Sequence, residues 1–227
     1  QPLLIPLWLL DNDDFAILLN ATSHSQLPII ERMVKLVKIF SSSDEMALKY
    51  KNHLIAKAIL SILYSNQNAS SKRNDVFSIF NSCQTPQFNP NAIVKGAGYT
   101  RKFIDCFLIN DKDNFSESVL LSEYVTSFID EDLEHYEEKN TNFFTLEDLE
   151  KAINFTLISE GLLRNEKAYN DAITLKVRLH SILISEYSKY FAVTNFITKD
   201  QYIASLVSKN NRKAQIINFN LEDVEDW

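Results

Sequence analysis

The chain has 227 residues, of which 45% are hydrophobic and 23% charged, so it is long and apolar enough to bury a core without disulfides or metals. Its net charge of −7 argues against a protein that binds nucleic acid through a generally basic surface. Only three residues are glycine, so tight hairpins and glycine-rich phosphate loops are expected to be scarce. Helices joined by short polar loops, with the twenty-one asparagines supplying turns and caps, are the expected architecture.

Two features bear on the compartment. Cys83 and Cys106 lie outside any CxxC motif and are predicted to be free, buried thiols rather than zinc ligands or a disulfide. The apolar residues 1–10 contain two prolines and are too short to span a bilayer, so we expect no membrane segment. We therefore expect an intracellular protein, without distinguishing cytoplasm from nucleus. Because Gln1 stands where a methionine would start a chain, we expect a fragment of a longer protein.

The first predicted helices follow from apolar spacing. Pro28 is a typical first-turn residue, and apolar residues recur at helical spacing from there to Phe40. Asp44 can cap a second helix that extends to Ile62, and the short connection predicts an antiparallel helical hairpin. Three lysines of the second helix are expected to reach solvent: Lys49, Lys51 and Lys57.

The middle of the chain is more broken. Residues 66–74 are polar and predict a loop before a short helix over 76–80. Asn89 and Pro90 read as an N-cap and a first-turn proline, which predicts a helix through the two nearby glycines to about residue 108. The charged segment 110–116 is a candidate boundary between sub-domains.

Further helices are predicted in the second half. A helical stripe covers 121–128, and a near capping box at Thr145 starts a helix that extends to about residue 161. A helix of about 24 residues is predicted from the apolar spacing between Ala172 and Tyr190. Thr198 has a glutamine three residues later, which predicts another capped helix.

The C-terminal end changes pattern. Apolar and polar residues alternate over 217–221, which is typical of a strand, so a short β-strand is expected within 214–221. Residues 222–227 form an acidic tail. The sequence as a whole predicts an all-α fold, an irregular array of helical hairpins or a bundle, in a single domain over 1–227.

The segment VKGAGYTRK at 94–102 is the first candidate site. Two glycines could expose backbone N–H groups to an anion, and three basic residues add positive charge. The alternative is a glycine bend between helices with solvated basic side chains. The candidate anion or nucleic-acid patch consists of Lys95, Gly96, Gly98, Arg101 and Lys102.

Other chemistry is weakly indicated. Asp132 and His135 have the spacing of two metal ligands on one helix face, but no second pair of this kind accompanies them, and a solvated acidic helix face is favoured. We therefore expect no metal and no cofactor. No motif of a known nucleophile or metalloenzyme is present, which leaves catalysis undecided with a lean against it.

Tryptophans in unusual settings are candidate partner contacts. Trp227 ends the acidic tail and could anchor in a basic-rimmed groove, and Trp8 is expected to be exposed. The alternative is that the tail folds back or stays disordered. The candidate partner contacts are Trp8, Glu222, Asp223, Glu225, Asp226 and Trp227.

Three functions are consistent with these patterns. The first is a non-enzymatic scaffold module that binds protein partners within a larger intracellular assembly. The second is a nucleic-acid-associated subunit with a local basic patch formed by 95–102 and 209–213. The third is a helical enzyme or small-ligand binder whose pocket is assembled in space. The sequence leaves the oligomeric state open.

Overall fold

The computed structural model of the chain describes residues 3–138, 142–159, 166–209 and 212–213, and in these residues the fold is predominantly α-helical, as predicted. The α-helices are α1 (Asn12–Leu18), α2 (Leu27–Ser41), α3 (Glu45–Leu63), α4 (Ala69–Ser82), α5 (Ser118–Thr126), α6 (Leu146–Ser159), α7 (Glu166–Ile184) and α8 (Lys199–Val207). Short 3-10 helices are η1 (Leu7–Leu9), η2 (Phe103–Phe107), η3 (Glu131–Leu133) and η5 (Glu186–Phe191). The strands are β1 (Ile93–Gly96), β2 (Tyr99–Lys102), β3 (Ser208–Lys209) and β4 (Arg212–Lys213).

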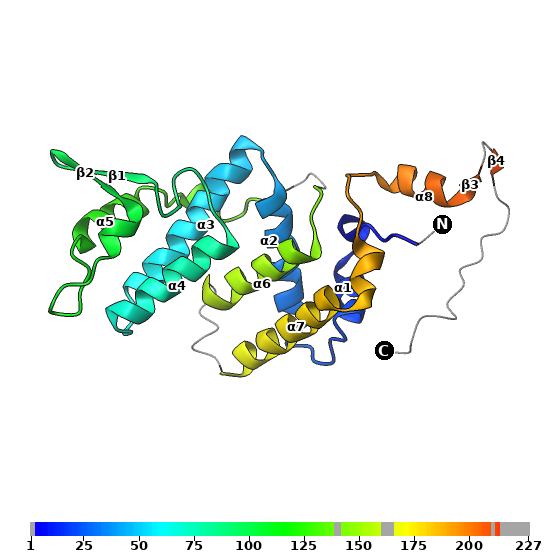
Figure 1. The fold of residues 1–227 in the computed structure, drawn as a ribbon, viewed down its shortest axis with the longest axis horizontal. Coiled ribbons are helices and arrows are strands. Elements are labelled where there is room, and N and C mark those ends of the chain that lie inside the picture. The colour runs from blue at the N-terminus through cyan, green and yellow to red at the C-terminus, as the bar shows by residue number, and fades with distance from the viewer. Residues whose placement is uncertain (1–2, 139–141, 160–165, 210–211, 214–227) are drawn as a thin grey trace.

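The helices form an elongated array (Figure 1). The β1–β2 hairpin and α5 lie at one end of the long axis, and α8 with β3 and β4 lies at the other. Helix α3 packs against α2, α4, α5 and α6, and its residues are buried on most sides. Buried side chains from η1 to α7 form a connected hydrophobic core. None of the described helices is long and apolar enough to cross a bilayer.

The predicted helices over 28–40 and 44–62 are confirmed as α2 and α3. The Asp44 side chain accepts a hydrogen bond from the Met46 N–H at 2.8 Å and caps α3 as expected. The two helices touch, but α2 packs more extensively against α6 than against α3. Lys51 does not extend into solvent as predicted, because its Nζ lies 2.6 Å from the Ser42 carbonyl oxygen. Burial is the main cause that lowers the Lys51 pKa from its ordinary value.

The N-terminal apolar segment is part of the core. Trp8 is only 4% exposed, so the prediction of an exposed indole is wrong. Its ring contacts Phe143 and Phe196, at centroid distances of 5.1 and 5.7 Å, and its Nε1 donates to the Ile197 carbonyl oxygen at 2.8 Å. The segment docks there because its apolar side chains remove more surface from water by packing than by facing solvent.

Helix α4 begins earlier than the predicted short helix over 76–80. Asn68 accepts a hydrogen bond from the Ser71 N–H at 2.8 Å and starts the helix at Ala69, inside the segment expected to be a loop. The cap helps the polar residues of the first turns to form a helix because it satisfies one of the free backbone donors at the helix start.

The helix predicted through the glycines to residue 108 is wrong. The chain there forms β1, a two-residue turn, β2 and then η2. Asn89 does not cap a helix: its side chain accepts from the Asn91 N–H at 2.9 Å and makes a local turn before β1. Within the candidate boundary at 110–116 the chain makes a tight turn over 110–114, and Phe115 then packs on Phe107 at 5.2 Å between ring centroids.

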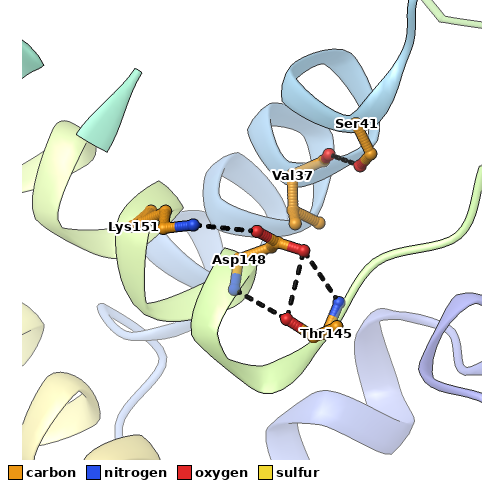
Figure 2. A network of polar contacts seen from close by, with 5 residues as sticks. All are labelled: Val37, Ser41, Thr145, Asp148 and Lys151. Atoms are coloured by element: carbon orange, nitrogen blue, oxygen red, sulfur yellow. Dashed lines mark hydrogen bonds and ion pairs between the residues drawn. The ribbon is translucent and has the colours of Figure 1, made fainter. Parts of the chain in front are cut away.

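Helix α6 has a reciprocal cap that the sequence indicated as a near capping box (Figure 2). The Thr145 N–H and Oγ1 each lie 3.1 Å from Asp148 Oδ2, and the Asp148 N–H donates to Thr145 Oγ1 at 3.3 Å. Asp148 also accepts from Lys151 at 3.2 Å. Ser41 bonds to the Val37 carbonyl on the facing helix α2 in the same view. The cap fixes where α6 starts against α2.

The predicted helix of about 24 residues, with its apolar stripe from Ala172 to Tyr190, is partly confirmed. Helix α7 ends at Ile184, and Ser185 then caps η5 by accepting from the Tyr187 N–H at 3.2 Å. The predicted cap of α8 is present, since Gln201 Oε1 accepts from the Thr198 N–H at 2.9 Å and Thr198 Oγ1 accepts in return at 3.2 Å. The strand predicted over 217–221 and the acidic tail lie outside the described residues.

Candidate functional site

The segment singled out in the sequence forms a β-hairpin whose two faces differ. Val94 pairs with Arg101 and Lys95 with Thr100, and residues directly opposite in an antiparallel pair point to the same face. One face therefore carries Val94, Gly96, Tyr99 and Arg101, and the other carries Ile93, Lys95, Thr100 and Lys102. Val94 is fully buried, so the first face is the inner one.

A carboxylate from α5 holds the inner face. Glu117, immediately before α5, accepts from Tyr99 Oη at 2.8 Å and from Arg101 Nε at 3.2 Å. The Arg101 guanidinium also lies over the Tyr99 ring, 5.2 Å from its centroid. The hydrogen bond from Tyr99, followed by that from Arg101, lowers the Glu117 pKa, and the same bond raises the Tyr99 pKa. The three side chains brace the hairpin against α5.

The two glycines of the hairpin have different roles. Gly98 has a φ of +86° while Ala97 keeps a negative φ, which is the sign pattern of a type II turn with glycine at its third position. Gly96 instead provides space: a Cβ there would lie 2.8 Å from the Tyr99 ring. The glycines thus shape a turn and seat a ring within the hairpin, and the binding of an anion there stays a prediction.

The outer face of the hairpin is open to solvent. Ile93 is 54% exposed, and Lys95, Thr100 and Lys102 are exposed as well. Lys95 and Lys102 are diagonal neighbours across the two strands. The backbone positions of such neighbours are about 7–8 Å apart. We call these four residues the outer face. It presents two ammonium groups beside one apolar side chain on a braced strand pair.

The hairpin is also anchored through its base. Phe103 follows β2 directly, is fully buried, and contacts Phe80, Phe88 and Phe107 at centroid distances of 5.6, 5.9 and 5.3 Å. The backbone N–H of Phe103 donates to the Ala92 carbonyl oxygen at 2.8 Å. Aromatic packing of this kind fixes the strand pair on the helical array.

The structure separates the predicted patch. Lys95 and Lys102 lie on the outer face, whereas Arg101 lies on the inner face with Glu117. The described residues of the second basic segment, Lys209 in β3 and Arg212–Lys213 in β4, lie at the opposite end of the molecule from the hairpin, so they do not form one patch with it (Figure 1). The hairpin and the β3–β4 strands are far apart because they lie at opposite ends of an elongated helical array.

Other predicted residues have these positions. Glu222, Asp223, Glu225, Asp226 and Trp227 lie outside the described residues, and their role as partner contacts stays a prediction. The helix face expected for Asp132 and His135 is wrong, because only Glu131–Leu133 form a single 3-10 turn there. Within the described part of the chain, no group of three or more His, Cys, Asp or Glu side chains is placed to hold a metal.

The prediction of free, buried thiols is confirmed for both cysteines. Burial raises the pKa of Cys83 to about 12 and that of Cys106 to about 11. Both thiols are therefore protonated at neutral pH, which disfavours reaction as thiolates.

Sequence reasoning missed Glu117, which lies 16 residues from Arg101 along the chain and has no motif around it. In comparisons with known proteins, the chain matches no family model, no curated protein and no solved structure.

Proposed function

We propose that the protein is a non-enzymatic interaction module whose hairpin binds a protein partner through its outer face. The observation that carries the proposal is that the hairpin is held rigidly on one face and exposed to solvent on the other. The inner face is fixed by Glu117 and the core, while all four outer-face residues remain open to solvent. A rigid element loses little conformational entropy on binding, which favours affinity.

The chemistry of the outer face indicates an acidic partner segment with an apolar side chain. Two lysines can meet carboxylates, and Ile93 can pack on an apolar residue between them. Arg101, the third basic residue of the hairpin, is already engaged by Glu117. Two lysines on a chain of net charge −7 give few phosphate contacts, so an acidic protein segment is favoured over nucleic acid.

A photo-crosslinking experiment tests this function. A photoreactive amino acid replaces Thr100 on the outer face, and a control protein carries it at Asn74, which is exposed on α4. Each full-length protein is irradiated in its native cells, and the adducts are identified by mass spectrometry. We expect one protein adduct that is specific to position 100. Equal labelling from both positions, or adducts with nucleic acid at position 100, would contradict the proposal.

A further inference from the structure

A cavity of about 560 Å³ lies between helices α2, α3 and α6 and the segment after η3. Its volume is in the range of small-molecule sites. The lining residues of α3, from Tyr50 to Ser61, recur at intervals of three or one, which places them on one side of that helix. One wall of the cavity is therefore a single helix face. The described lining residues include none from the β1–β2 hairpin, so this cavity is a separate feature of the molecule.

The charged groups around the cavity already have partners. Lys57 Nζ lies 2.6 Å from Glu134 Oε1, and both residues line the cavity. Arg32 also lines it and interacts with another residue of the chain. A charged ligand would lose its hydration here without meeting an unpaired lysine, arginine or carboxylate among the described lining residues, which is unfavourable. The cavity is therefore suited to a neutral ligand.

His53 directs an N–H group into the cavity. The backbone N–H of Asp130 donates to His53 Nδ1 at 3.1 Å, so the neutral imidazole carries its proton on Nε2. Burial, followed by the charge of Lys57, lowers the His53 pKa and favours this neutral form. Nε2 has no hydrogen-bond partner among the described residues, yet it is not sealed from solvent. Because His53 is only 2% exposed and lines the cavity, the open side of Nε2 faces the cavity.

The Tyr50 hydroxyl is a second group of this kind. Tyr50 lies three residues before His53 on α3, and their rings are nearly parallel, with an interplanar angle of 10° and centroids 6.0 Å apart. Tyr50 is 3% exposed, and its Oη is accessible but has no hydrogen-bond partner in the described part of the chain. Buried tyrosine hydroxyls usually bond within the fold. Tyr50 and His53 thus present two unused hydrogen-bond donors to one cavity.

Apolar side chains complete the wall. Leu54 and Ala58 lie on the same face of α3 as the two donors, and Phe155 comes from α6. An apolar ligand body can pack against these three side chains. The two donors require an acceptor, and a carbonyl oxygen has two lone pairs with which it can accept from both.

We infer that this cavity binds a small neutral molecule with a carbonyl group, such as a ketone or an amide. The carbonyl oxygen accepts hydrogen bonds from His53 Nε2 and Tyr50 Oη, and the apolar body packs against Leu54, Ala58 and Phe155. The volume admits a body of about the size of one or two aromatic rings. This site is independent of the partner proposed for the hairpin.

Three probes of similar shape test the ligand class: acetophenone, α-methylstyrene and benzoate. α-Methylstyrene has a CH₂ group in place of the carbonyl oxygen of acetophenone, and benzoate has a negative charge. Each probe is titrated into the ¹⁵N-labelled full chain, and binding is followed by NMR. We expect acetophenone to bind with a stoichiometry of one, to shift the His53 Nε2 resonance, and to bind roughly tenfold more tightly than the other two. No binding of acetophenone, or binding of either other probe as tight as that of acetophenone, would overturn the inference.

A pair of tyrosine variants locates the binding. Tyr50→Phe removes a hydroxyl that makes no hydrogen bond with the described residues, so its circular dichroism spectrum should match that of the parent. We expect it to bind acetophenone about tenfold more weakly. Tyr64→Phe removes a hydroxyl from a residue that is 73% exposed at the end of α3, and it should bind acetophenone as the parent does. If Tyr50→Phe binds acetophenone as tightly as Tyr64→Phe, the site is not the one inferred.

Discussion

Tyr99 Oη and Glu117 Oε2 lie 2.8 Å apart and join strand β2 to the start of α5. Glu117 also receives Arg101, so one carboxylate holds two side chains of the inner face. These two bonds fix the orientation of the hairpin relative to α5. They involve only the inner face, so the outer face remains open to solvent.

The first prediction concerns the Glu117 carboxyl. Its pKa should lie below the ordinary value of 4.5, because the bond from Tyr99 and then that from Arg101 favour the ionised form. This contribution to stability is present above pH 4.5 and is lost as the pH falls through the lower folded-state pKa. Titration of the side-chain ¹³C resonance should show the depressed value, and Tyr99→Phe should raise it. An unchanged value in Tyr99→Phe would mean that the bond is not formed in solution.

Alanine substitutions should separate the two glycines. Gly98→Ala places a side chain at a φ of +86° and should destabilise the fold by roughly 1–2 kcal/mol in denaturant unfolding. Gly96→Ala has no such backbone penalty, but its Cβ should displace the Tyr99 ring and return the Glu117 pKa towards its ordinary value. Equal effects of both variants on the Glu117 titration would contradict these separate roles.

Phe103 should be the main anchor of the hairpin. Phe103→Ala leaves a cavity beside four other rings and should lower the free energy of unfolding by about 3–5 kcal/mol. Phe103→Leu keeps most of the volume and should cost less than about 1.5 kcal/mol. Urea unfolding measures both. A loss below 1 kcal/mol in Phe103→Ala would show that the base of the hairpin is not packed as described.

His53 should make stability depend on pH. The His53 pKa is lowered in the folded state, so below its ordinary value of 6.5 the unfolded chain binds more protons than the folded chain. The free energy of unfolding therefore decreases as the pH is lowered below 6.5. Above pH 6.5 its contribution is constant. Lys57 opposes protonation of His53, while Glu134 and Asp130 favour it. His53→Gln has no titrating ring. When the free energy of unfolding is measured between pH 5 and 7.5, this variant should therefore lack the part of the pH dependence that comes from His53. An identical slope in both proteins would refute the assignment.

Local signals explain which elements could be predicted. Asp44, the Thr145–Asp148 pair and the Thr198–Gln201 pair each act within three residues, and all three caps are present. The hairpin was missed because Asn89 and Pro90 match the start of a helix, whereas the Asn89 side chain makes a local turn before β1. With few glycines in the chain, a hairpin was also not expected.

The sites depend on pairs that are distant in the sequence. Glu117 meets Tyr99 across 18 positions, and His53 meets Asp130 across 77. Neither pair has a local pattern, so only the packing of the helices brings them together. Burial of Trp8 likewise depends on Phe143 and Phe196, which come from the far half of the chain.

The most direct test of the hairpin's function is charge reversal on its outer face. Lys95→Glu with Lys102→Glu is compared with Lys167→Glu with Lys199→Glu, which makes the same charge change at exposed positions on α7 and α8. Each tagged full-length protein is purified from its native cells near 0.15 M salt, and the crosslinked partner is quantified. We predict at least a tenfold loss of that partner in the hairpin variant alone. Equal recovery from both variants would contradict the account.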